Sequence, residues 1–565
     1  MNNSATYAAN LRDAEAGKAA YEQICKDFEQ GPEINKNLLM KILNDNKDTE
    51  YGKKYGFADI TTVEEYQKRL PVIVYDNIAD EIERMCNGEQ NILTAYPYQH
   101  MNETSATTGV PKRIPMTQPQ SEVFLKYNKM YMDGLKANEL DSKWMEGRAF
   151  CTSEGKHKTL PSGITVGDAS SVMANYIRGG KETMGSMMAA LFTSPVEATL
   201  PVPQTDTKYI HARFALMDAD ITGIICGFYS LVVNYLKYIA ENYALLIDDI
   251  EHGTINDEIN LTDEVRESLL KKIEPMPERA RELRKIFENG SDFCFVPKVW
   301  PKMSYIAGVG GDGFSIYDRI IKERYTGNCL KNIYSGVTAS EGLWSVPGGI
   351  DTEDSVMAPG SAFFEFLPVE YGDDFTKCVT MDQVEVGKTY ELIVTNLSGF
   401  YRYRTSDAVK VTGFRGNTPL IQFMYRVNRT INMAAEKTTE KALQIAVENT
   451  MDEFGLTLGN FCVYPDYDNM TYVFLVEPIK EDVGISEEQL TECVYKHMRE
   501  ANGEFAGYVD TGRLNKPVAH WLLPESGMLY RDMLVYRGAS ANQTKPVRVI
   551  TNEQQRKFFF ALVMQ

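Results

Sequence analysis

The chain has 565 residues, of which 43% are hydrophobic and 24% are charged, so it is long enough for a large core and for two to four domains. A net charge of -19 with no Lys/Arg run disfavours a nucleic-acid-binding protein, because phosphate backbones are bound by basic surfaces. The 9 cysteines are widely spaced without a C-x-x-C pair, which disfavours a disulfide framework or a zinc motif. The polar N-terminus and the lack of a run of about 18 apolar residues predict no signal peptide, no membrane span and a cytoplasmic location.

Helical periodicity marks the first part of the chain. Leu38, Leu39, Ile42 and Leu43 recur at helical spacing and predict a helix, and the polar stretch 44–50 predicts a loop after it. A second helix is predicted from about residue 221 to 243. Its buried stripe would consist of apolar residues three or four positions apart, namely Ile224, Phe228, Leu231, Tyr235 and Ile239.

The pattern changes to strands between residues 390 and 414, where short β-type runs at 391–395 and 407–412 are separated by turn residues. Beyond about residue 427, the order helix, strand, strand, helix, strand predicts an α+β domain of about 135 residues, close to the usual domain size. The ranges of these elements are 437–451, 460–464, 471–477, 486–500 and 518–523. Ser486 and Gln489 form a capping box at the start of the second helix.

Residues 104–112, Thr-Ser-Ala-Thr-Thr-Gly-Val-Pro-Lys, form the first segment suited to chemistry. Hydroxyls and free backbone N–H groups bind phosphate oxygens, and a lysine supplies a mobile positive charge. The order of residues differs from a Walker loop, which disfavours a P-loop nucleotidase. Taken alone, such a segment is more often a surface turn.

Two further segments carry acidic residues. Glu341 ends the run Thr-Ala-Ser-Glu, after the glycine-rich turn 308–313, and its carboxylate could bind Mg²⁺. An ordinary helix N-terminus is equally compatible with this run. In the segment 401–407, Tyr-Arg-Tyr-Arg-Thr-Ser-Asp, Asp407 precedes a predicted strand and could accept hydrogen bonds from a ribose diol. The alternative for Asp407 is a surface ion pair with an arginine.

In this order the three segments resemble the signature set of the acyl-adenylate-forming superfamily, which includes acyl-CoA synthetases, peptide-synthetase adenylation domains and luciferases. Within it the chain resembles the Gretchen Hagen three family of auxin-responsive acyl acid amido synthetases, and specifically a bacterial member. The more specific segments are Gly-Phe-Tyr-Arg-Tyr-Arg at 399–404, Val-Thr-Gly-Phe at 411–414 and the late run 538–546. Trp-Pro at 300–301 and Phe-Glu-Phe-Leu-Pro at 364–368 also carry the resemblance, which covers nearly the whole chain.

The resemblance implies a large N-terminal adenylate-forming domain, residues 1–427, and a small mobile α+β domain, residues 428–565. The former is expected to be α/β, with mixed sheets flanked by helices and a small barrel-like part. Near the ATP phosphates the resemblance places Ser105, Thr107, Thr108 and Lys112. It assigns Glu341 to Mg²⁺ and Asp407 to the ribose; near the adenylate and adenine it places Thr338, Ser340, Gly310 and Gly311. Arg426 matches the hinge arginine, and Lys437 and Lys545 match lysines that the small domain brings to the nucleotide.

Four positions depart from the family pattern. Ala106 and Val110 replace loop glycines, Val337 stands where an adenine-side tyrosine is usual, and Ser406 replaces the glycine before the ribose aspartate. A non-glycine residue in left-handed geometry costs roughly 1 to 2 kcal/mol, which is small against a total stability of about 5 to 15 kcal/mol. We therefore expect the fold and the activity to survive these changes.

The implied activity is a ligase reaction. A carboxylic acid attacks the α-phosphate of ATP, pyrophosphate leaves, and an amino acid or amine then attacks the acyl-adenylate. Two alternatives stay open: an acyl-CoA ligase that uses a thiol acceptor, and a catalytically weakened relative that binds a nucleotide or an acid. The sequence identifies neither the acid nor the amine, and both a monomer and a dimer remain compatible with it.

Overall fold

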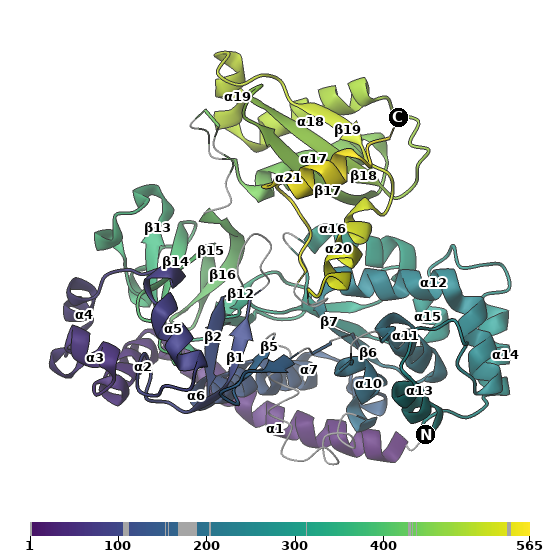
Figure 1. Cartoon of the computed structure of the whole chain (residues 1–565), viewed down its shortest axis with the longest axis horizontal. Helices are drawn as coiled ribbons and strands as arrows, with labels where there is room; N and C mark the ends of the chain where they lie inside the picture. The colour runs from purple at the N-terminus through teal and green to yellow at the C-terminus, as the bar shows by residue number, and fades with distance from the viewer. Residues whose placement is uncertain are drawn as a thin grey trace.

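The computed structural model describes residues 3–104, 112–152, 154–155, 157–167, 189–202, 205–311, 314–427, 431, 433–434, 436, 438–539 and 544–564. Several sheets and many helices form the chain, so the predicted mixture of α/β and α+β structure is confirmed (Figure 1). Within these ranges, no helix combines the length and the apolar character needed to cross a membrane.

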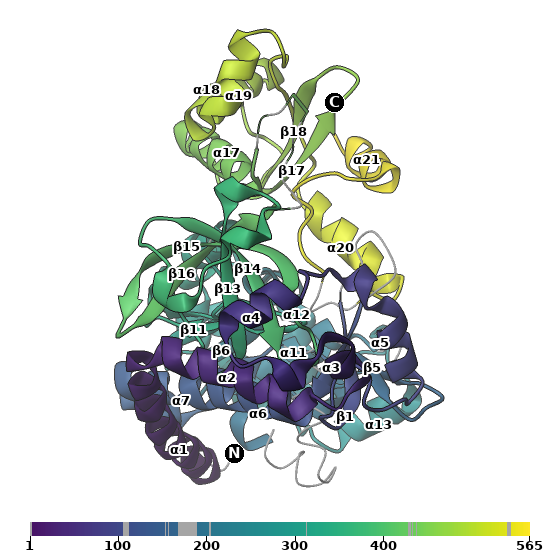
Figure 2. The same cartoon turned by 90° about the vertical axis from the view of Figure 1, so that its left-hand side faces the viewer.

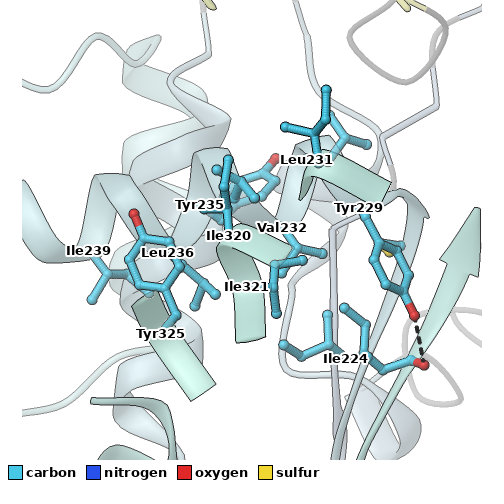
Figure 3. Close-up of a cluster of buried hydrophobic side chains, with 14 of the residues drawn as sticks. Ile224, Tyr229, Leu231, Val232, Tyr235, Leu236, Ile239, Ile320, Ile321 and Tyr325 are labelled. Carbon is cyan, nitrogen blue, oxygen red and sulfur yellow. Dashed lines mark hydrogen bonds between the residues drawn. The ribbon is translucent and has the colours of Figure 1, made fainter. Parts of the chain in front are cut away.

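A parallel four-stranded sheet lies at the centre of the larger part of the chain. Its order is β3 (Ala149–Cys151), β6 (Gly223–Phe228), β7 (Tyr305–Val309) and β8 (Lys331–Tyr334). Helices α11 (Thr207–Met217), α12 (Tyr229–His252) and α16 (Ser315–Ile320) contribute apolar side chains to the core beside this sheet. In Figure 3, Leu231, Val232 and Tyr235 of α12 lie beside Ile320 and Ile321.

The helix predicted over 221–243 is wrong in its first part. Residues 223–228 form strand β6, which pairs in parallel with both β3 and β7, and the helix begins only at Tyr229. A strand buried on both faces in a parallel sheet is apolar throughout, so its residues also satisfy a helical spacing. Ile224 is buried as predicted, but it belongs to the sheet on which α12 packs.

A six-stranded antiparallel sheet follows in the chain. Its order is β11 (Ser345–Pro347), β12 (Ser355–Met357), β16 (Thr418–Arg426), β15 (Tyr403–Arg415), β14 (Thr389–Asn396) and β13 (Ala362–Pro368). β14 and β15 confirm the strands predicted at 391–395 and 407–412. The first predicted helix is α2 (Gly31–Asn46), which packs on β13. A short loop after it leads into α3 (Glu50–Tyr55).

A third sheet has the order β2 (Arg113–Thr117), β1 (Tyr98–Glu103), β5 (Thr165–Gly167) and β4 (His157–Thr159). The described residues of this part also form the α-helices α1 (Asn3–Glu29), α4 (Val63–Arg69), α5 (Ala79–Cys86), α6 (Gln118–Phe124), α7 (Tyr131–Glu139), α10 (Val196–Thr199), α13 (Asp263–Leu270), α14 (Pro277–Ile286) and α15 (Val296–Val299).

Most of the described residues from 438 onward form a lobe at the top of Figures 1 and 2, and these residues together are called the C-terminal lobe below. Its helix α20 (Ser526–Tyr536) extends down to the larger part of the chain, where Glu525 at its start pairs with Lys237 of α12. Its sheet has the order β17 (Leu458–Asp466), β18 (Thr471–Pro478) and β19 (Val518–Trp521), with α17 (Glu440–Phe454) and α18 (Glu487–Ala501) packed on each other. The predicted element order and the capping box are thus confirmed. Three helices were not predicted, namely α19 (Gly503–Asp510), α20 (Ser526–Tyr536) and α21 (Glu553–Phe560).

Candidate active site

A cavity of about 1680 Å³ is lined both by the C-terminal lobe and by the chain before it. The predicted site residues in its wall are Lys112, Gly310, Gly311, Thr338, Ser340, Glu341, Asp407, Arg426 and Lys545. Ser105, Thr107, Thr108 and Lys437 lie outside the described residues. Positions far apart in the sequence therefore meet at one cavity.

Glu341 lies at the tip of a β-hairpin formed by β9 (Thr338–Ala339) and β10 (Gly342–Leu343). The alternative of a helix N-terminus at this position is wrong. Two buried asparagines fix the tip, because the side-chain amide of Asn102 donates to the Ser340 carbonyl at 2.9 Å and that of Asn396 donates to the Glu341 carbonyl at 2.8 Å. Hydrogen bonds therefore fix the backbone of both loop residues, Ser340 and Glu341, and with it the position from which the carboxylate extends.

The Glu341 side chain is half-buried in the cavity wall. The Tyr403 hydroxyl donates to its Oε1 at 3.2 Å. Burial raises the pKa of Glu341, and the Asp407 carboxylate raises it further, while Arg426 and Lys112 act in the opposite direction. A nearby cation would stabilise the charged form of Glu341, because it would offset both the desolvation and the neighbouring negative charge.

Asp407 and Arg426 lie opposite each other on strands β15 and β16. The Arg426 Nε donates to Asp407 Oδ1 at 3.0 Å, and the aspartate charge raises the pKa of the arginine. The Asp407 side chain is only 5% exposed, so the pair is not the surface ion pair considered as an alternative. Asp407 belongs to strand β15 and does not precede it, and it lies within a register shift against β14 between Arg404 and Ala408.

Ser406 adopts a left-handed backbone with φ of 63° inside that irregular stretch. This is the position where the family pattern has glycine, and the conformation explains why glycine suits it. The serine accepts the same geometry at a cost of roughly 1 to 2 kcal/mol.

The glycine-rich turn follows strand β7. A Cβ on Gly310 would lie 2.8 Å from the Tyr229 ring, and Gly311 has φ of 65°. Position 310 therefore requires glycine for space, and the backbone conformation at position 311 favours glycine. The missing side chains make room for Tyr229 and Glu353 beside the turn, and both glycines line the cavity.

Two lysines reach the cavity from opposite sides. The Lys112 ammonium lies 5.4 Å from the centroid of the Tyr75 ring. Lys545 comes from the C-terminal lobe, and its ammonium lies 5.7 Å from the centroid of the Phe228 ring at the end of β6. Phe228 pairs with Val309, directly before Gly310, so Lys545 crosses to the glycine-rich turn.

Family models match most of the chain. The model described as the GH3 family N-terminal domain matches residues 20–330, and the models of the central and C-terminal domains match residues 355–426 and 441–554. The chain belongs to the GH3 family. The resemblance to the Gretchen Hagen three family noted in the sequence is thereby confirmed.

Named relatives of this GH3 chain are synthetases. It is 27% identical to the probable indole-3-acetic acid-amido synthetase GH3.1 of Arabidopsis thaliana, over 92% of this chain and 89% of that protein. It is 26% identical to the jasmonoyl-L-amino acid synthetase GH3.5 of Oryza sativa subsp. japonica, over 76% and 75%. The solved structure of the GH3.15 acyl acid amido synthetase has a TM-score of 0.82 at 24% identity and covers 96% of this chain and 95% of that one. This similarity establishes that the two folds are the same.

The run Tyr-Arg-Tyr-Arg at 401–404 of this GH3 chain has mainly framework contacts. Tyr401 stacks on Tyr51 with ring centroids 5.0 Å apart, and its hydroxyl donates to the Leu93 carbonyl. Arg404 binds Glu391 through two hydrogen bonds of 2.7 and 2.9 Å. Tyr403 reaches Glu341, and sequence reasoning did not predict this role, nor that of the two asparagines that fix the hairpin.

Apolar residues line another part of the cavity in this GH3 chain, and the strand β7 connects this part to the glycine-rich turn. Tyr305 begins β7 and Gly310 follows its end, so about 16 Å separate the two positions along an extended strand. The apolar side chains include Phe124, Met132, Trp144, Leu191, Phe192 and Tyr305. Such a surface suits the hydrocarbon part of a small organic acid.

Proposed function

We propose that this chain is an acyl acid amido synthetase, which uses ATP to form an acyl-adenylate and then transfers the acyl group to an amino acid or amine. One observation carries the proposal: Glu341, the Asp407–Arg426 pair, the glycine turn and Lys545 line the same cavity as an apolar surface that can receive the acid. The names of the relatives, amido synthetases for indole-3-acetic and jasmonic acids, support this reaction class.

The chemistry needs positioning and charge stabilisation more than a protein nucleophile. A free carboxylate is a poor acyl donor, so its oxygen attacks the α-phosphate of ATP, pyrophosphate leaves, and AMP becomes the leaving group for the amine. Asp407 holds the ribose through its carboxylate, which can accept more than the one hydrogen bond from Arg426. Backbone at Gly310 and Gly311 receives the adenine, and Lys112 and Lys545 stabilise the developing negative charge on the phosphates.

Glu341 would hold Mg²⁺. Oxygen donors suit this ion, and the desolvated Glu341 carboxylate at the cavity wall fits that preference. The ion supplies electrostatic stabilisation of the phosphate oxygens. Tyr403 and the two asparagines then serve to orient the carboxylate.

We further propose a division of the chain into a domain of residues 1–427 and a mobile domain of residues 428–565, which reorients between the two half-reactions and carries Lys437 and Lys545. The two parts share buried apolar residues, and polar contacts also join them; the exposed ion pair among these contacts supports mobility, since such pairs contribute little free energy. Lys208 binds Asp532 at 3.0 Å, and Ser315 binds Glu448 at 2.6 Å. The bacterial source and the cytoplasmic location stay predictions.

The test begins with ATP–pyrophosphate exchange against a carboxylic acid library that includes indole-3-acetic and jasmonic acids. Exchange with at least one acid is expected, and its absence over a broad library would favour a catalytically weakened relative. Mass spectrometry of reactions with pooled amino acids, pooled amines or coenzyme A then identifies the acceptor. An amide is expected, with a rate that rises toward mildly alkaline pH because the attacking amine must be deprotonated. A thioester as the main product would reassign the chain as an acyl-CoA ligase.

A further inference from the structure

Away from the cavity, a sulfur, an imidazole and a carboxylate meet between two helices of the C-terminal lobe. Cys493 and His497 lie one turn apart on α18, and Glu453 lies near the end of α17. One potential ligand atom from each of the three residues lies within 4.8 Å of the others. The relatives' names and the proposed reaction give these residues no role.

The three ligand atoms are close enough together to receive a metal after small movements. The His497 Nε2 lies 2.8 Å from Glu453 Oε2. Two ligand atoms of a tetrahedral zinc ion are separated by about 3.3 to 3.8 Å, given bonds of about 2.0 to 2.3 Å. Small side-chain movements would therefore suffice to place an ion among the three groups.

The other ring nitrogen of His497 lies beside a carboxylate, as is usual for histidines that bind a metal. Its Nδ1 lies 2.9 Å from the Glu500 carboxylate, one turn further along α18. A carboxylate on the far nitrogen fixes the ring orientation and directs Nε2 toward the ion. Cys493 and His497 are buried, whereas Glu453 is 44% exposed, so the ion would also be accessible to a water ligand.

One neighbouring cation competes for the same carboxylate. The Lys496 ammonium lies 2.7 Å from Glu453 Oε2, and its side chain is 53% exposed. An exposed ion pair contributes about 0 to 1 kcal/mol, so Lys496 can move into solvent at little cost. The soft thiolate and the imidazole together select zinc over Mg²⁺ or Ca²⁺.

We propose that Cys493, His497 and Glu453 form a zinc site that joins α17 to α18, with Glu500 orienting the histidine. The ion would reinforce α17, the helix whose Gln444 and Glu448 bind Ser315 of α16. Zinc would thus stabilise the face of the C-terminal lobe that touches the rest of the protein. The site is independent of the acyl and amine substrates.

Cobalt titration of the full-length, chelator-treated protein under a non-thiol reductant tests the site. We expect one Co²⁺ per chain, with a thiolate charge-transfer band and the visible bands of tetrahedral cobalt, and displacement of the cobalt by Zn²⁺. Cys493→Ala should abolish the charge-transfer band, and His497→Gln, which removes a ligand, should weaken cobalt binding by more than the roughly 10- to 100-fold loss typical of a changed outer-shell partner. Glu500→Gln should weaken it less while the charge-transfer band persists.

A second cluster provides the matched control. Asp248, Glu251 and His252 also lie within 4.8 Å of one another but contain no sulfur, so His252→Gln should leave the cobalt spectrum unchanged. Wild-type protein without a charge-transfer band at saturating cobalt would overturn the proposal even if Cys493→Ala fails to fold. Equal cobalt affinity in wild type and His497→Gln would overturn it as well.

Discussion

Two arginine–carboxylate pairs at the six-stranded antiparallel sheet have the same chemistry and different surroundings. Arg402 makes two hydrogen bonds of 2.9 and 3.0 Å to Glu365, and the two side chains are 5% and 0% exposed. Arg426 makes one bond of 3.0 Å to Asp407 at the cavity wall, and its side chain is 37% exposed. The first pair has no place for a ligand, while the second leaves oxygen atoms facing the cavity.

Arg402, which supports the fold, and Asp407, which faces the cavity, are thus only a few residues apart in the sequence. Arg402 also donates to the Gln67 and Leu70 carbonyls at 2.7 and 2.8 Å, so it connects the strand to helix α4 and the loop after it. Its φ of 46° is held by these contacts. Removal of Arg402 should therefore affect stability, whereas changes at Glu341 or Asp407 should affect the reaction.

The largest effect on stability is expected from Arg402→Ala. It leaves the Glu365 charge buried without its partner, which should lower the free energy of unfolding by about 3 to 5 kcal/mol. Denaturant unfolding monitored by circular dichroism measures the change. Lys388→Ala is the control, because Lys388 and Glu385 form an exposed pair worth at most about 1 kcal/mol. Equal losses in the two variants would contradict the framework role.

Glu341→Gln tests the cavity side of the comparison. The substitution keeps the volume but removes the charge that we assign to Mg²⁺, so pyrophosphate exchange should fall by about 10²- to 10³-fold or more. Stability should stay within about 0.5 kcal/mol of wild type, as expected away from buried framework groups. Tyr403→Phe should give a smaller loss, because it removes only the hydrogen bond that orients the carboxylate. Unchanged exchange in Glu341→Gln would exclude the metal assignment.

Asp407→Ala should weaken ATP binding by about 1.5 to 3 kcal/mol, the range for hydrogen bonds to a charged group. Isothermal titration with ATP measures the loss. The exposed Asp373, which binds Arg404 at 2.8 Å, provides the control, since Asp373→Ala removes a carboxylate from the loop between β13 and β14, outside the cavity. If Asp407→Ala leaves the ATP affinity unaltered, Asp407 does not bind the ribose and serves only as an ion-pair partner of Arg426.

The sequence predicted the elements that depend on neighbouring residues better than the features that depend on contacts between segments far apart in the chain. Local patterns located β14, β15, α18 and its cap, because strand alternation and capping are properties of neighbouring residues. The same reasoning misread residues 223–228 as helix, since a doubly covered strand and a buried helix are both apolar throughout.

For the candidate site, the resemblance selected residues that line one cavity, but it did not predict Tyr403, Asn102 or Asn396 as supports of the Glu341 hairpin. Their roles arise from contacts between strands far apart in the sequence. No local pattern encodes such contacts. The zinc ligands were missed for the same reason, because Glu453 and the Cys493–His497 turn meet only when α17 packs on α18.

The smallest expected effect concerns Ser406, which lies directly before Asp407 with φ of 63°. Replacement by glycine relieves roughly 1 to 2 kcal/mol of left-handed strain, but the added flexibility of the unfolded chain costs about 0.5 to 1 kcal/mol. Ser406→Gly should therefore raise the free energy of unfolding by up to about 1.5 kcal/mol while ATP affinity stays unchanged, because the backbone already has the required shape. Ser406→Ala separates the causes, since it removes the hydroxyl and keeps the strain, and it should give no gain. Equal stabilisation by alanine and glycine would mean that the hydroxyl, and not the backbone, destabilises this stretch of β15.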